Sequence, residues 1–122
     1  MEKGQEKTLC RIRDVYRSIA TFEAEFESKY GICLNEGMLL CSLSGNKYSS
    51  SELAEVLGLS NSNTSKVIKS VENKELVKRI IGKDDKRQMY FTLTDKGRAK
   101  LDGIHCEEIE LPEILKPFLA EM

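Results

Sequence analysis

The sequence predicts a mainly helical α+β domain, in which two short helices are followed by a two-stranded β-hairpin and flanked by helices at both ends. Three observations predict this fold class. A serine-capped apolar segment ends at Gly58, and a second serine cap follows at Ser60. Two β-type runs then enclose a turn rich in Gly, Asp and Lys. A tight helix pair followed directly by a hairpin is the order of a winged helix-turn-helix.

Length and composition limit the classes of function. The chain has 122 residues, of which 40% are hydrophobic, so we expect one domain over residues 1–122. No apolar run approaches the roughly 20 residues that a membrane-spanning helix needs. The N-terminus has no hydrophobic segment of the kind found in signal peptides. We therefore expect a cytoplasmic protein with no membrane partner.

Residues that carry catalytic or metal chemistry are few. The four cysteines include no C-x-x-C spacing. The single histidine, His105, adjoins Cys106, and adjacent helical positions point about 100° apart. We therefore expect no metal site and no cofactor. The sequence shows no Ser/His/Asp set, paired-carboxylate cleft or Gly-rich phosphate loop, so we expect no catalytic residues and no enzyme.

Charge is distributed unevenly along the chain. Residues 61–100 hold eleven Lys or Arg against five acidic residues, a local balance of +6. Residues 101–122 hold one Lys against six acidic residues, a balance of −5. A basic surface is what attraction to a polyanion requires. A solvated Lys-rich surface without a partner is the alternative.

A long N-terminal helix is predicted by a stripe at alternating steps of three and four from Leu9 to Tyr30, which is apolar except at Glu23 and is closed by Gly31. This seam offers more apolar surface than one small neighbour would cover. We therefore expect residues 1–31 to form a dimerisation helix, with packing inside one chain as the alternative. The residues expected at the dimer interface are Leu9, Ile12, Tyr16 and Ile19.

The winged helix-turn-helix core is expected over residues 35–93. Its first helix is predicted around Met38–Leu43, with Asn35 as the N-terminal cap. The first helix of the tight pair follows, and Ser49 and Glu52 have the spacing of a capping box at its start.

The second helix of the pair is expected from Asn61 to Asn73, with Ser60 as its cap. One face is apolar, and the opposite face is small, polar and positive. Short hydroxyls and amides allow close approach to a DNA groove, and lysines reach phosphates and base edges. A polar face directed only to solvent is the alternative. The candidate DNA-binding residues here are Ser60, Asn61, Ser62, Asn63, Ser65, Lys66 and Lys69.

The hairpin is predicted by two β-type runs, Leu76–Ile81 and Arg87–Leu93. Alternation in the second run places Met89, Phe91 and Leu93 on the inward face. The loop between the runs has turn-forming residues with cations on both sides. The candidate DNA-binding residues of the hairpin are Lys83, Asp85, Lys86 and Arg87.

The C-terminal segment, residues 94–122, is expected to form a shortened helix followed by an acidic tail. Thr94 provides the cap of this helix, which we expect to continue until Pro112 stops it.

Taken together, these segments resemble the MarR family of transcriptional regulators over about residues 10–104. The resemblance is carried by SELAEVLGLSNSNTSKVIKSVENKELVKRI, by Asp85-Lys86-Arg87 as an Asp-x-Arg wing, and by Leu93-Thr94-Asp95-Lys96-Gly97. It implies a homodimer whose second helix of the pair enters the major groove while the wing lies along the minor groove. It also implies that Arg87 lies in or near the minor groove, held by Asp85.

The chain departs from the family pattern at three places. Glu75 stands where the family usually has Gly. The residue with left-handed backbone conformation after the second helix of the pair is therefore expected elsewhere, with Asn73 as the candidate. Thr64 replaces an apolar core residue. Only 28 residues follow Thr94, so the C-terminal dimerisation element is expected to be shortened and the N-terminal seam to contribute more.

The sequence thus predicts a sequence-specific regulator of MarR type that binds double-stranded DNA at a pseudo-palindromic site as a homodimer. The resemblance also implies a small-molecule effector bound between the dimerisation helices and the winged domain. One branch of the family senses peroxide through a cysteine early in the first helix, so a redox-sensing regulator using Cys10 is one alternative. A protein-binding winged helix that does not bind DNA is an alternative of another class.

Overall fold

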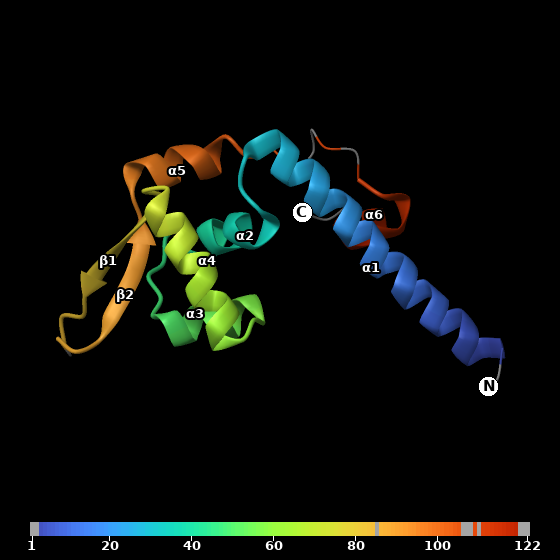
Figure 1. Cartoon of the computed structure of the whole chain (residues 1–122), viewed down its shortest axis with the longest axis horizontal. Helices are drawn as coiled ribbons and strands as arrows, with labels where there is room; N and C mark the ends of the chain where they lie inside the picture. The colour runs from blue at the N-terminus through green and yellow to red at the C-terminus, as the bar shows by residue number, and fades with distance from the viewer. Residues whose placement is uncertain (1–2, 85, 106–108, 110, 120–122) are drawn as a thin grey trace. The chain divides into compact units, whose positions relative to one another are not determined.

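The computed structural model describes residues 3–84, 86–105, 109 and 111–119, with side chains described from residue 7 onward. The chain divides into two compact units, residues 1–33 with 105–122 and residues 34–104. The first unit contains α1 (Lys3–Tyr30), the 3₁₀ helix η2 (Glu113–Leu115) and α6 (Lys116–Leu119) (Figure 1). The second contains α2 (Leu34–Ser42), α3 (Ser50–Leu57), α4 (Asn61–Asn73), β1 (Val77–Ile81), β2 (Met89–Leu93) and α5 (Asp95–Asp102).

In the first unit, the end of α1 is tied to the beginning of the C-terminal segment. The Tyr30 hydroxyl donates to the carbonyl of His105 and accepts from its backbone N–H, both at 2.9 Å. The Tyr30 ring lies 5.1 Å from the ring of buried Phe26. Gly31 ends the helix in the left-handed region at φ +73°, which a residue without a Cβ adopts at no steric cost. The predicted end of the N-terminal helix is confirmed.

In the second unit, the helix pair begins with the predicted capping box. Ser49 Oγ accepts from the backbone N–H of Glu52 at 3.2 Å, and Glu52 Oε1 accepts from the N–H of Ser49 at 3.0 Å. Gly58 ends α3 at φ +68°, and Ser60 Oγ then caps α4 by accepting from the N–H of Asn63 at 3.1 Å. The predicted boundaries of α4 are confirmed.

The core of the second unit lies where α2, α3 and α4 meet. Leu39, Leu40, Leu53 and Val71 are completely inaccessible to solvent. Thr64 is also fully buried, and its hydroxyl donates to the carbonyl of Ser60 at 2.8 Å. A buried hydroxyl with a partner avoids the desolvation cost of an unpaired one, which explains how a threonine occupies this core position.

The two strands pair antiparallel, with Val77 opposite Leu93, Arg79 opposite Phe91 and Ile81 opposite Met89. Both strands are shorter than the predicted runs. The prediction that Met89 is buried with Phe91 is wrong: Phe91 is 5% exposed, but Met89 is 38% exposed. Met89 lies on the same face of the hairpin as Phe91, as alternation predicts, but burial on that face ends at Phe91.

Two helix boundaries also differ from the predictions. The first core helix, α2, begins at Leu34 rather than behind an Asn35 cap. The helix after the hairpin is capped by the Thr94 hydroxyl as predicted, but it ends at Asp102 and not at Pro112. Gly103 closes it by donating its N–H to the carbonyl of Ala99 at 3.1 Å. Residues 106–108, 110 and 120–122 of the predicted acidic tail, including Cys106, lie outside the described residues.

The turn after α4 uses Glu75 itself as its left-handed residue, at φ +64°. The expectation that Asn73 would adopt this conformation is wrong, because Asn73 is the last helical residue. The N–H of Leu76 donates to Val71 and that of Glu75 donates to Glu72, each at 2.9 Å. These two bonds form the Schellman pattern that closes many helices.

Replacing Glu75 with Gly is expected to raise the free energy of unfolding by about 0.5–1 kcal/mol, because the Cβ makes the left-handed conformation costly. The measurement is urea denaturation. Glu75→Ala is the matched control: it removes the carboxylate but keeps the Cβ, so no comparable gain is expected. Equal stability of the two variants would contradict the strain at this position.

Candidate nucleic-acid interface

The exposed face of α4 carries the polar and cationic residues that the sequence singled out. Thr64, Ile68 and Val71 are buried on the side that packs into the core. The remaining face is open, and its exposed members are Asn61, Ser62, Asn63, Ser65, Lys66 and Lys69, preceded by exposed Ser60. The structure therefore brings every predicted residue of this segment to the surface at the N-terminal two-thirds of one helix.

No described residue neutralises the lysines on this face. Within the described part of the chain, neither Lys66 nor Lys69 forms an ion pair or a side-chain hydrogen bond. The N-terminal end of α4 adds the partial positive charge of its helix dipole. An anion approaching this end of the helix meets backbone N–H groups and two lysines.

The turn of the hairpin presents a second group of cations. Lys83, Lys86 and Arg87 are exposed, and the N–H of Gly82 donates to the carbonyl of Gln88 at 2.8 Å to close the turn. Asp85 lies outside the described residues, so its predicted pairing with Arg87 stays a prediction. Figure 1 shows the hairpin tip and the N-terminal end of α4 on the same, lower side of this unit.

An ion pair joins the C-terminal end of α4 to the hairpin. Arg79 on β1 donates to the Glu72 carboxylate through Nε at 2.8 Å and through a terminal nitrogen at 3.1 Å. These hydrogen bonds and the negative charge of Glu72 raise the pKa of Arg79 above its usual value. The guanidinium also lies 5.5 Å from the centroid of the Phe91 ring. The pair fixes the hairpin relative to α4, and sequence reasoning missed it.

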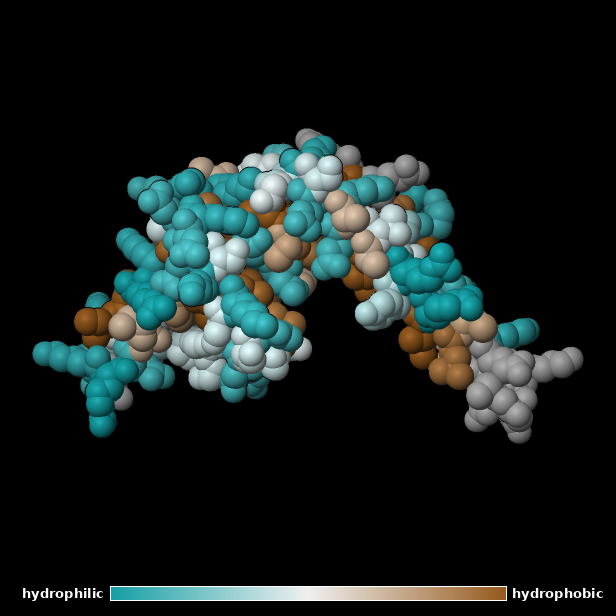
Figure 2. Space-filling view, in the orientation of Figure 1, coloured by the Kyte–Doolittle hydropathy of each residue, from teal (hydrophilic) through white to brown (hydrophobic). Residues whose placement is uncertain are grey.

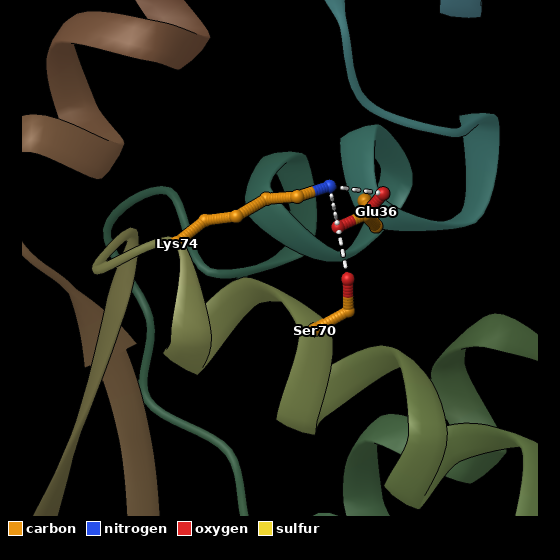
Figure 3. A network of polar contacts seen from close by, with 3 residues as sticks. All are labelled: Glu36, Ser70 and Lys74. Carbon is orange, nitrogen blue, oxygen red and sulfur yellow. Dashed lines mark hydrogen bonds and ion pairs between the residues drawn. The ribbon is translucent and has the colours of Figure 1, made fainter.

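A second polar cluster holds the C-terminal half of α4 to α2 (Figure 3). The carboxylate of Glu36 is almost fully buried. It accepts from the Ser70 hydroxyl at 2.8 Å and from Lys74 Nζ at 2.8 and 3.0 Å. A buried carboxylate is tolerated when such donors compensate its lost hydration. The cluster was not predicted, because its members lie 34 and 38 residues apart in sequence.

The predicted dimer seam is exposed in the described chain. Leu9, Ile12, Tyr16 and Ile19 are 55%, 59%, 76% and 44% exposed. Figure 2 shows hydrophobic surface on α1 near its N-terminal end. Cys10 is also exposed there, and its oxidation stays a prediction, as does the small-molecule effector.

Other site classes receive no support from the described residues. No group of three or more His, Cys, Asp or Glu side chains among them could hold a metal ion. None of the helices that the structure describes is long and apolar enough to cross a membrane.

Comparisons with known proteins agree with this geometry. A family model described as "Transcriptional regulator SarA/Rot" matches residues 21–104. The structure of the transcriptional regulator BldR from Sulfolobus solfataricus is 26% identical over all of this chain and 88% of its own, with a TM-score of 0.75. AbsC, a MarR family regulator from Streptomyces coelicolor, is 20% identical over all of this chain and 83% of its own, with a TM-score of 0.74.

One further structure includes DNA. A mutant MarR from E. coli complexed with operator DNA is 18% identical over 95% of this chain and 84% of its own, with a TM-score of 0.71. Comparison with curated protein sequences gives no match. These structural likenesses confirm the winged-helix fold predicted from the sequence.

Proposed function

Because the chain belongs to the SarA/Rot family of transcriptional regulators, and is thus a winged-helix DNA-binding protein, we propose that it binds a pseudo-palindromic duplex site as a homodimer. The predicted resemblance to MarR regulators is confirmed by this family and by its structural neighbours. The family consists of regulators rather than enzymes.

One observation carries the proposed mode of DNA binding: the N-terminal end of α4 and the hairpin tip lie on one side of the second unit, and both segments carry exposed cations. Lys66 and Lys69 come from α4, and Lys83, Lys86 and Arg87 come from the hairpin. An α-helix fits the major groove, where short side chains such as Ser62 and Asn63 permit close approach to base edges. The hairpin then lies along the adjacent minor groove.

The homodimer is supported by the exposed seam on α1. Four large apolar residues at helical spacing face solvent in a single chain, and contiguous exposed apolar surface marks an interaction site. A second copy offers the same seam and covers it symmetrically. Two recognition helices about 34 Å apart then meet successive major grooves, which gives the site its two-fold symmetry.

Duplex titration over a range of salt concentrations tests the proposal. Each neutralised phosphate contributes about −0.9 to the slope of log affinity against log salt. Four or more lysine contacts therefore predict a slope of about −4 or steeper, and sedimentation should give the mass of two chains. A winged helix that docks only on protein would show no dependence of affinity on salt and would not retain random duplex at low salt. That result would overturn DNA binding. A monomer bound to a single half-site would overturn the dimer.

A further inference from the structure

An apolar pair interrupts the cationic surface of the hairpin. Ile81 and Met89 are directly opposite each other on β1 and β2. They are 62% and 38% exposed, although both are large and apolar. Figure 2 shows hydrophobic surface at the hairpin beside hydrophilic side chains. Neither residue contributes much to the core, so packing within one chain does not explain why two large apolar residues stand here.

The pair lies on the face of the hairpin that is turned toward α4. Alternation places Ile81 on the same face as Arg79, and Met89 on the same face as Phe91. Arg79 reaches Glu72 on α4, and Phe91 is buried in the core. Ile81 and Met89 therefore continue this inner face beyond the point where the core covers it.

A groove of about 710 Å³ separates α4 from this face. Its α4 side carries Ser65 and Lys69, and its hairpin side carries Met89 and Phe91. One side thus offers a hydroxyl and a cation, and the other offers apolar surface. The Glu72–Arg79 ion pair contributes to the same lining and holds the two sides together.

Duplex DNA fits this combination of chemistries. When α4 lies in the major groove and the hairpin in the minor groove, one sugar-phosphate strand must pass between them. The phosphates of that strand match Lys69 on one side and Lys83 and Lys86 at the hairpin turn. Its deoxyriboses present C–H groups, which are suited to an apolar side chain. An acidic peptide would match the cations but would leave the apolar pair without a defined contact.

We propose that Ile81 and Met89 bind the deoxyribose edge of the DNA strand that crosses the groove between α4 and the hairpin. This inference rests on the proposed DNA-binding function. The lysines neutralise phosphates and make affinity depend on salt, whereas the apolar pair removes C–H surface from water and contributes equally at every salt concentration. The two contributions are therefore separable by measurement.

The test is the double variant Ile81→Thr with Met89→Gln. Threonine keeps the β-branch that suits a strand, and glutamine keeps the length of methionine, so the fold is expected to persist. Affinity for duplex DNA should fall about tenfold at each salt concentration, as expected for two partly buried apolar side chains, with an unchanged salt slope. Lys83→Gln should instead make the slope shallower by about one.

Two control variants make the result specific. Met38→Gln applies the same chemical change to an exposed methionine on α2 and should leave affinity unchanged. Met89→Leu also changes the side chain on the strand but keeps it apolar, and it should retain affinity. This control separates loss of the apolar contact with DNA from loss of strand stability.

If the double variant binds DNA as tightly as the wild type, the proposed apolar contact is wrong and the proposed function is unaffected. An affinity loss with a shallower slope would overturn the apolar contact too, since the pair would then act through the position of the cations. If the wild-type chain shows no salt-dependent duplex binding, the proposed function fails and this inference fails with it.

Discussion

Replacing Arg87 with Ala is expected to lower the affinity for duplex DNA about 100-fold, a larger loss than at any single lysine of the interface. Arg87 is exposed at the hairpin turn, at the position that the resemblance to the MarR family matches to a wing arginine. A narrow minor groove concentrates negative potential, so a guanidinium inserted there gains more than a cation beside one phosphate. By comparison, Lys66→Ala should cost about tenfold and one unit of salt slope.

Arg87→Lys separates charge from geometry. Lysine keeps the positive charge but loses the planar fork of donors, so we expect the salt slope of the wild type with an affinity between those of wild type and Arg87→Ala. The measurement is fluorescence anisotropy on one duplex at several salt concentrations. Equal losses for Arg87→Ala and Lys66→Ala would refute the placement of Arg87 in the minor groove.

The starts of α3, α4 and α5 were predictable because their signals are local. Ser49 and Glu52 form a capping box three residues apart, and Ser60 and Thr94 each cap a helix through an N–H three residues ahead. Such contacts depend only on the residues around one helix terminus. The candidate face of α4 was predictable for the same reason, since helical spacing alone separates its polar residues from the buried side.

Contacts between elements were not predictable from patterns. Glu72 meets Arg79 only because the chain reverses between α4 and β1, and Glu36 meets Lys74 only once α2 packs on α4. Nothing in the spacing of these residues distinguishes them from ordinary surface charges. The exposure of Met89 is a similar case, because alternation determines its face but tertiary packing determines how far burial extends.

Gly97→Ala is expected to destabilise the protein by about 3 kcal/mol and to lower the melting temperature by about 10 °C. A Cβ built at Gly97 would lie 1.9 Å from the backbone oxygen of Leu76. This oxygen also accepts from the N–H of Thr94 at 3.1 Å, so it has little freedom to move away. The first turn of α5 therefore packs directly on backbone that leads into β1, and a methyl group would have to displace that backbone.

Gly103→Ala is the matched control, because it adds the same methyl group at a nearby glycine where no atom is too close. Its built Cβ meets no atom closer than 3.5 Å, which is ordinary contact. The alanine also restricts the unfolded chain, so stability should be unchanged or slightly increased. If thermal unfolding shows the two variants to be equally stable, the close approach at Gly97 does not exist. If Gly97→Ala alone is destabilised, this glycine is needed because the backbone between α4 and the hairpin leaves no room for a side chain at that position.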